Sequence, residues 1–107
     1  MGFFAKYHNK ITPCEGIRFH SKAEATRYQE LRLLERAKEI SSLELQPAFP
    51  LHSANGEAIC KYIADFKYVN KDGLRVVEDK KGFKTPVYII KKKWFLSEYP
   101  EYIFLET

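Results

Sequence analysis

Acids and lysines that could together hold a metal ion stand in the second half of this 107-residue chain. Asp65 lies inside the largely apolar segment YIADFKY, and the stretch VEDKKG follows at residues 77–82. A carboxylate in an apolar strand is costly to bury unless it is paired, hydrogen-bonded or bound to a cation. The turn sequence NKDG between the two segments predicts a hairpin, which would bring Asp65 close to the acids of VEDKKG. Like charges so placed repel unless a cation lies between them, and Mg²⁺ prefers such oxygen ligands.

The acids and lysines of VEDKKG can be combined in two frames, Glu78-x-Lys80 or Asp79-x-Lys81. Side chains alternate along a strand, so the two frames point to opposite faces of a sheet. In either frame the lysine shares a face with its acid, where it can orient or deprotonate a water or stabilise charge developing on phosphorus. The two preceding valines do not select a frame, because each face carries one of them. From the residues alone, both frames stay open.

Length and composition set the outer bounds. We expect one domain over residues 1–107, with residues 1–20 as a possible N-terminal arm. The net charge of +4 favours polyanionic partners only mildly. Cys14 and Cys60 are far apart and outside any metal-binding pattern, so we expect buried free thiols, which suit a reducing compartment. No apolar run has the length of a membrane span and no signal peptide is recognisable, which predicts no membrane association and a cytoplasmic location.

The elements that would position these residues can be placed from pattern. The order of helix, strands, hairpin, helix and strand predicts an α/β (α+β) fold with a mixed central sheet flanked by helices. Prolines divide the first strand region, which predicts one or two short strands there with an edge position. The expected elements are a helix over 21–40 that opens with a Ser-x-x-Glu capping pattern, strands within 41–53, a hairpin of 57–69 and 74–82, a helix over 86–99, and a strand over 101–106.

These motifs resemble a known superfamily. An Asp, a spacer and an acid-x-Lys are similar to the PD-(D/E)xK nucleases, which have the restriction-endonuclease-like fold. The segment YIADF followed by acid-x-Lys-Gly resembles the endonuclease I-type Holliday-junction resolvases, which also carry a glutamate in a Ser-x-x-Glu context on the preceding helix, where Glu24 stands in SKAE. KYHNK, GIRFHSKAEATRYQEL, LELQP, YIADFKY and VEDKKGFKT together resemble small phage-encoded proteins of unknown function that are grouped with these nucleases. The resemblance covers nearly the whole chain, and its specificity comes from the order and spacing of short motifs.

The resemblance implies a metal-dependent DNA endonuclease that leaves 5′-phosphate and 3′-hydroxyl ends. Asp65 and Asp79 would ligate Mg²⁺ or Mn²⁺, and Glu24 would contact a second metal ion or its water shell. Lys81 would position the attacking water and stabilise the transition state. A glycine follows the catalytic lysine in the resolvase branch, and because Gly82 follows Lys81 the resemblance selects the Asp79-x-Lys81 frame. It also implies branched DNA as substrate, such as a Holliday junction or a replication fork, a homodimer that makes two nicks, and a phage or prophage source.

Other interpretations remain open at this stage. The Ser-x-x-Glu pattern at Glu24 can cap a helix without any catalysis, and VEDKKG can be a solvated run of charges. The chain could also be a non-catalytic DNA-binding or assembly protein, or a nuclease subunit that needs a partner. Six lysines and no acid between residues 80 and 93 predict contacts with phosphates, as do basic residues near the glutamate. The expected DNA contacts are Arg18, Lys22, Lys84, Lys91 and Lys92.

Overall fold

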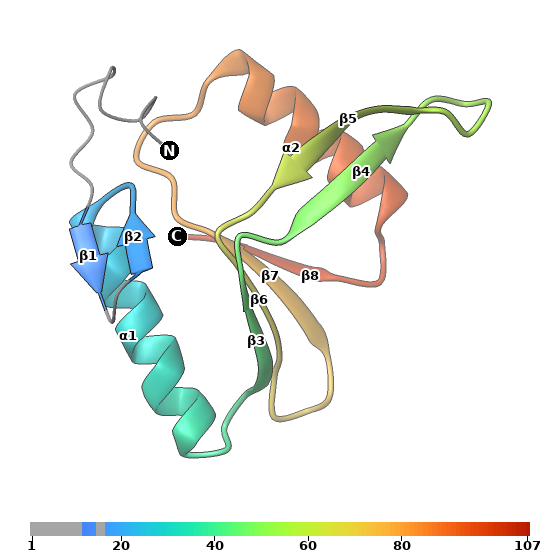
Figure 1. Cartoon of the computed structure of the whole chain (residues 1–107). Coiled ribbons are helices and arrows are strands. Elements are labelled where there is room, and N and C mark those ends of the chain that lie inside the picture. Colours follow the sequence, from blue (N-terminus) through green and yellow to red (C-terminus); the bar gives the residue numbers. More distant parts are fainter. Residues whose placement is uncertain (1–11, 15–16) are drawn as a thin grey trace. The chain divides into compact units, whose positions relative to one another are not determined.

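The computed structural model describes residues 12–14 and 17–107 (Figure 1). It has two helices, a mixed four-stranded sheet and two small antiparallel sheets, which confirms the predicted α+β class. Among the described residues, neither helix has the length and apolar character that crossing a bilayer requires. In chain order the elements are β1 (Thr12–Cys14), β2 (Ile17–Phe19), α1 (Lys22–Arg36), β3 (Ser41–Leu45), β4 (Ala48–His52), β5 (Ala58–Ile63), β6 (Phe66–Val69), β7 (Arg75–Asp79), α2 (Pro86–Glu98) and β8 (Ile103–Glu106).

The chain divides into two compact units, Met1–Glu39 and Ile40–Thr107, which are described separately below. The expectation of one domain over the whole chain stays a prediction. Most of the expected N-terminal arm lies outside the described residues, but β1 and β2 within it pair as a short antiparallel ladder. Cys60 is a half-buried free thiol, as expected, whereas the side chain of Cys14 is not described.

The predicted capping of α1 is present in the N-terminal unit. The Ser21 hydroxyl accepts a hydrogen bond of 3.1 Å from the Glu24 N–H, which satisfies one of the free donors of the first helical turn. The Glu24 carboxylate in turn accepts from the His20 N–H at 3.0 Å. The helix ends at Arg36, four residues before the expected end, because Lys38 adopts a left-handed conformation (φ 63°) that breaks the helical path.

The segment 57–69 was expected to be one strand, and the structure divides it at Ala64–Asp65. β5 pairs with β4 in a two-stranded sheet, while β6 joins the four-stranded sheet of order β3-β6-β7-β8. The opposing segment bends at the same level, because Gln46 has a positive φ of 48° and Pro47 lacks an N–H. Two backbone bonds, from the Gln46 N–H to the Asp65 carbonyl at 2.9 Å and from the Ala64 N–H to the Pro47 carbonyl at 3.1 Å, keep the bent segments together. The prediction that Asp65 lies within a continuous strand was therefore wrong: it lies in the bend.

The predicted hairpin around NKDG is confirmed as β6 and β7, which pair antiparallel with Phe66 opposite Glu78. Gly73 in the turn has φ 82°, a conformation that glycine adopts without strain. β7 then pairs with β8 in parallel, with Asp79 opposite Glu106, and α2 forms the crossover between these two strands. The carboxyl end of β7 consequently lies next to the end of the chain.

α2 begins and ends almost where the sequence predicted. The Thr85 hydroxyl accepts from the Tyr88 N–H at 3.1 Å, and Pro86 occupies the first turn, where its missing N–H has no consequence. The helix runs alongside β4 and β5 (Figure 1). Its buried side chains join one apolar cluster with residues of the sheets, namely Phe49, Leu51, Tyr62, Ala64, Val77, Tyr88 and Phe95. The edge of this cluster is where the candidate site lies.

Candidate metal centre at the end of β7

Asp65 and Asp79 are brought together by backbone pairing. The β6–β7 register places Phe66 opposite Glu78, and the Asp65 N–H donates to the Glu78 carbonyl at 3.2 Å, so the ladder continues into the bend. The next antiparallel position sets Asp65 opposite Asp79, the last residue of β7. The Lys80 N–H donates to Asp65 Oδ2 at 2.7 Å, which ties this carboxylate to the chain directly after β7.

The side chain of Asp79 is fully buried, with 0% exposure. Its Oδ2 accepts a hydrogen bond from the Tyr62 hydroxyl, a buried donor from β5. Its Oδ1 accepts no hydrogen bond among the described residues, although Lys81 Nζ lies 3.3 Å away as an ion pair. Lys81 Nζ also lies 4.8 Å from the centre of the Tyr88 ring, which favours the ammonium through a cation–π contact. One carboxylate oxygen is therefore held in place and the other keeps acceptor capacity.

The electrostatics of the pair favour a cation. The pKa of Asp79 is raised to about 6. Burial is the largest cause, and the charge of the neighbouring Asp65 carboxylate is the second. The hydrogen bond from Tyr62 and the charge of Lys81 lower the pKa of Asp79 without cancelling the rise. Burial also raises the pKa of Tyr62 well above its usual range, so this hydroxyl keeps its proton and remains a donor. Protein groups compensate the two carboxylates only in part.

The neighbouring acid, Glu78, lies on the opposite face of β7. Its side chain is 1% exposed, and the Tyr68 hydroxyl donates to Glu78 Oε2 at 2.6 Å. Lys80 is exposed. The geometry thus groups Asp79 and Lys81 with Asp65, and it groups Glu78 with a tyrosine. Sequence reasoning missed both tyrosine partners; the signal available was that a buried carboxylate needs a donor and that tyrosines stand on the adjacent strands.

Glu24 belongs to the N-terminal unit. Its side chain is 3% exposed and accepts a hydrogen bond from the N–H of His20, the residue before the Ser21 cap, a local contact of the kind that the capping alternative predicts. Among the other expected contacts in this unit, Lys22 is exposed at the start of α1, and the side chain of Arg18 lies outside the described residues. Within the unit of residues 40–107 the structure brings together Asp65, Asp79 and Lys81, the three predicted catalytic residues that this unit contains.

The two carboxylates of Asp65 and Asp79 suit a hard cation that keeps several water ligands. They are too few for a cation whose ligands all come from the protein. Within the part of the chain that the structure describes, no group of three or more His, Cys, Asp or Glu side chains could hold a metal ion. Mg²⁺ needs no such group, since it commonly binds through one or two carboxylates and completes its shell with water and substrate phosphate. Asp79 Oδ1 and the adjacent Asp65 carboxylate fit that pattern, and a bound cation would relieve their mutual repulsion.

Sequence comparison adds the family. A model for the family described as "Protein of unknown function (DUF1064)" matches residues 4–105. The chain belongs to this family. Searches of curated proteins and of solved structures returned no match. The family description assigns no activity, so the chemistry of the site in this DUF1064 protein rests on its own residues.

Two of the lysines expected to contact DNA are held by an acid that the sequence did not single out. Lys84 Nζ and Lys92 Nζ lie 2.9 Å and 3.2 Å from the two carboxylate oxygens of Glu106. The Tyr88 hydroxyl donates to Glu106 at 2.5 Å. Hydrogen bonds from Tyr88 and Lys84 lower the pKa of Glu106 to about 2, so this acid remains ionised. Glu106 was not recognisable in advance, because its position beside these lysines depends on the parallel pairing of β7 with β8.

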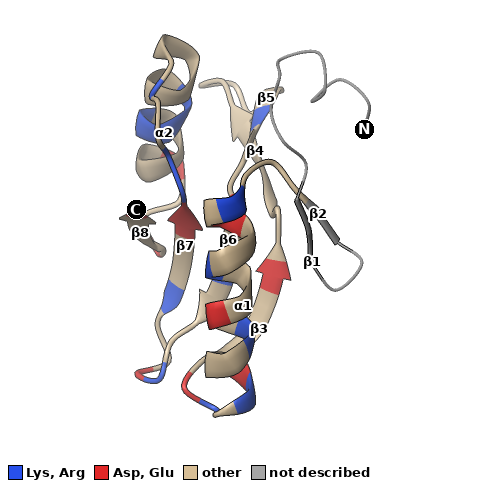
Figure 2. Cartoon of the chain, turned by 90° about the vertical axis from the view of Figure 1, so that its left-hand side faces the viewer, with Lys and Arg blue, Asp and Glu red and all other residues tan. Residues whose placement is uncertain are grey.

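A groove of about 260 Å³ adjoins the carboxylates in this DUF1064 protein. Tyr62 and Lys81 line it together with two further lysines, Lys61 from β5 and Lys91 from α2. Lys91 Nζ donates to the Lys61 carbonyl at 3.1 Å, which fixes the ammonium over β5. Figure 2 shows the change of charge along the chain, from the acidic end of β7 to the basic residues that follow it and those of α2. A polyanion in this groove would contact Lys81, which is paired with Asp79.

Proposed function

We propose that this protein is a metal-dependent DNA endonuclease that hydrolyses phosphodiester bonds. The observation that supports the proposal best is the buried Asp79 with the half-buried Asp65 and with Lys81 beside it, next to a groove that Lys81 lines together with two further lysines. A buried acid whose pKa is raised and that stands with a second acid next to a cationic cleft is typical of sites that bind a divalent ion and a phosphate. The resemblance of the motifs to PD-(D/E)xK nucleases supports the same reaction.

The side chains then take distinct roles. Asp65 and Asp79 would hold Mg²⁺, or Mn²⁺, which when bound polarises the phosphoryl oxygen and lowers the pKa of a bound water. The Tyr62 hydroxyl donates to Asp79 Oδ2, so Oδ1 would be the oxygen that binds the ion. Lys81, close to Asp79 and supported by the Tyr88 ring, orients the attacking water and stabilises the extra negative charge on the phosphoryl group in the transition state.

The substrate and assembly follow from the resemblance. A branched DNA, such as a Holliday junction, would be nicked by a homodimer whose two sites act on two strands and leave 5′-phosphate ends. Lys61 and Lys91 would bind phosphates in the groove, and Lys84 and Lys92 would do so when a phosphate replaces Glu106. Glu24 would approach the second metal ion or its water shell. A phage or prophage protein of this kind would act in the cytoplasm of its bacterial host.

A nicking assay tests the proposal. A labelled four-way junction and a linear duplex of the same arm sequence are incubated with the protein in Mg²⁺, Mn²⁺ or EDTA. We expect metal-dependent nicking of the junction, lost in Asp79→Asn and kept in the matched variant Glu78→Gln. If nicking is lost in Glu78→Gln but kept in Asp79→Asn, the active residues are those of the frame Glu78-x-Lys80. If no DNA is nicked with any of the metals, the proposed endonuclease activity is refuted.

The rival function is a non-catalytic DNA-binding protein. The cationic groove suits this rival as well as it suits an enzyme. It predicts that the wild-type protein retards the junction in a native gel equally well in Mg²⁺ and in EDTA and never nicks it. Nicking that arises only after addition of a host-cell extract would instead indicate a subunit that needs a partner.

A further inference from the structure

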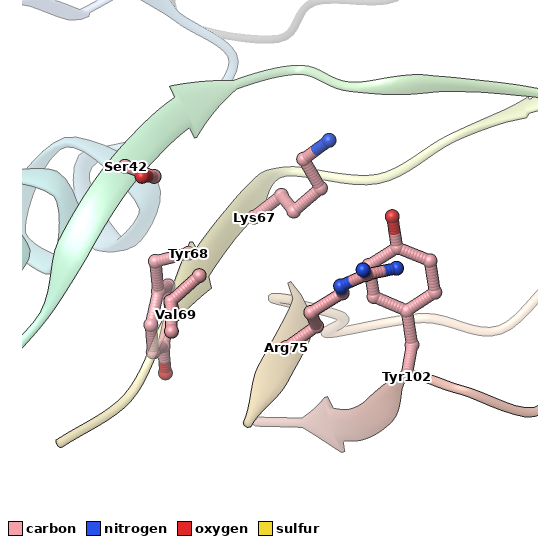
Figure 3. A pocket seen from close by; sticks show the side chains of 6 residues that line it. All are labelled: Ser42, Lys67, Tyr68, Val69, Arg75 and Tyr102. Carbon is pink, nitrogen blue, oxygen red and sulfur yellow. The ribbon is translucent and has the colours of Figure 1, made fainter. Parts of the chain in front are cut away.

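A second pocket lies at the opposite end of β7 from Asp79 and has a volume of about 340 Å³ (Figure 3). Arg75 begins β7 and Asp79 ends it, so four residues, or roughly 13 Å of strand, separate the two sites. The residues that line the pocket all belong to the unit Ile40–Thr107 and are Ser42, Lys67, Tyr68, Val69, Arg75 and Tyr102.

Strand register explains why these side chains meet. Val69 lies opposite Arg75, and Lys67 is two residues before Val69, so alternation directs the three to one face of the sheet. The side chain of Tyr68 extends to the other face of the strand, where its hydroxyl donates to Glu78. The ring of Tyr102 reaches the pocket from the segment that precedes β8 and packs edge-on against Phe49, with 5.4 Å between ring centres. This contact fixes the aromatic wall of the pocket.

Three polar side chains of the pocket, those of Arg75, Ser42 and Tyr102, have no hydrogen-bond or ion-pair partner among the described residues. Arg75 is exposed and makes no ion pair with any described residue. The hydroxyls of Ser42 and Tyr102 likewise have no hydrogen-bond partner in the described part of the chain. Lys67 is paired at 3.1 Å with Glu44, but that acid is 52% exposed and is not part of the lining, and such exposed pairs are weak. A guanidinium, an ammonium and two hydroxyls beside an aromatic ring match an oxyanion attached to a flat group.

We propose that this pocket binds a nucleotide, with its phosphate on Arg75 and Lys67 and its base against the Tyr102 ring. An arginine that has no ion-pair partner in the described part of the chain can form two parallel hydrogen bonds with phosphate oxygens. An aromatic ring held by the core provides a stacking surface that accepts any base. The volume falls within the range of small-ligand sites. The nucleotide is either a free nucleoside phosphate or the end of a DNA strand, because both present the same group. The site does not require the proposed metal centre, since it shares no residue with it.

Binding is tested on the full chain by following backbone amide chemical shifts in EDTA. The probes are a deoxynucleoside, its 5′-monophosphate, and a short single-stranded oligonucleotide with or without a 5′-phosphate. We expect the monophosphate to shift the amides of Arg75, Val69 and Tyr102, and the unphosphorylated nucleoside to leave them unchanged. Stronger binding of the 5′-phosphorylated oligonucleotide than of the monophosphate would identify a strand end as the source, and the reverse order would identify a free nucleotide.

Variants assign the effect to the pocket. Arg75→Ala should weaken binding of the monophosphate about tenfold or more, because a charge-assisted contact is lost. Lys93→Ala removes the same charge from an exposed position on α2 and should leave the affinity within about twofold. Tyr102→Phe keeps the ring and removes the hydroxyl, so it should weaken binding less than Arg75→Ala. Equal affinities of the wild type and Arg75→Ala, or equal shifts with the nucleoside and its monophosphate, would overturn the proposal whether or not the protein nicks DNA.

Discussion

Replacing Asp79 by asparagine should stabilise the metal-free protein at neutral pH. The side chain is fully buried, and burial together with Asp65 raises its pKa from 3.8 to about 6. A shift of about two units corresponds to roughly 3 kcal/mol at 1.36 kcal/mol per unit. Asparagine has the same shape, carries no charge, and still offers the Tyr62 hydroxyl an oxygen acceptor. The free energy of unfolding of Asp79→Asn should therefore exceed that of the wild type by up to about 3 kcal/mol at pH 7.

The size of this difference depends on pH. Because the folded-state pKa of Asp79 is the higher one, protonation contributes stability that is fully present below pH 3.8 and is lost as the pH rises through about 6. The gain of Asp79→Asn over the wild type should thus be near zero at about pH 4 and reach its full size near pH 7. Urea unfolding in EDTA at several pH values measures it. A variant that is less stable than the wild type at pH 7 would refute the reasoning and make Asp79 a structural partner of Lys81.

With Mg²⁺ present, the wild type should become more stable than Asp79→Asn. Mg²⁺ bound by the native state alone raises the wild-type free energy of unfolding by mass action, by about 2.7 kcal/mol at one hundred times its Kd. Asp79→Asn should lose this response. Glu78→Gln is the matched control, since it makes the same acid-to-amide change at the neighbouring buried residue but on the face that meets Tyr68. Loss of the Mg²⁺ response in Glu78→Gln rather than in Asp79→Asn would show that the site has been assigned to the wrong face.

Three further changes probe the surroundings of the site. Tyr62→Phe leaves Asp79 Oδ2 without its donor and should lower the free energy of unfolding by roughly 1–3 kcal/mol and weaken Mg²⁺ binding, measured by urea unfolding and calorimetry; unchanged Mg²⁺ affinity would show that the hydrogen bond does not orient the carboxylate. Lys81→Ala should abolish junction nicking while gel retardation of the junction stays within a fewfold of wild type, and loss of binding alone would make Lys81 a phosphate contact. Lys91→Ala should reduce the salt dependence of DNA affinity by about one phosphate contact, which the exposed Lys93→Ala should not do.

Local chemistry determined much of what could be predicted. Thr85 and Pro86 specify the start of α2, because a hydroxyl acceptor and a residue without an N–H suit the first turn in any context. The capping pattern at Glu24 and the NKDG turn were reliable for the same reason: their partners lie within a few residues along the chain. The Asp79-x-Lys81 frame came from Gly82 and family resemblance, and the contacts of Asp79 agree with it.

What was missed depends on contacts between distant segments. The bend at Ala64–Asp65 carries no glycine or proline of its own, and the residues that accompany it, Gln46 and Pro47, stand on the partner strand. The β-strand propensities of the residues in YIADFKY therefore favoured one uninterrupted strand. The position of Glu106 beside lysines of α2 likewise follows from β8 pairing parallel to β7, a register that no local pattern specifies.

The bend itself bears on function. A sheet needs no carboxylate at Asp65, and like charges at directly opposed strand positions are destabilising. The chain nevertheless places Asp65 next to Asp79, and three contacts offset part of the repulsion between their charges. The Tyr62 hydroxyl donates to Asp79 Oδ2, the Lys80 N–H donates to Asp65 Oδ2, and the Lys81 ammonium is ion-paired with Asp79. None of these contacts uses Asp79 Oδ1 as a hydrogen-bond acceptor. A purely structural pair would be expected to complete its hydrogen bonds within the protein. An arrangement that holds two acids together and leaves one buried oxygen without a hydrogen bond from any described residue is what the proposed metal site requires.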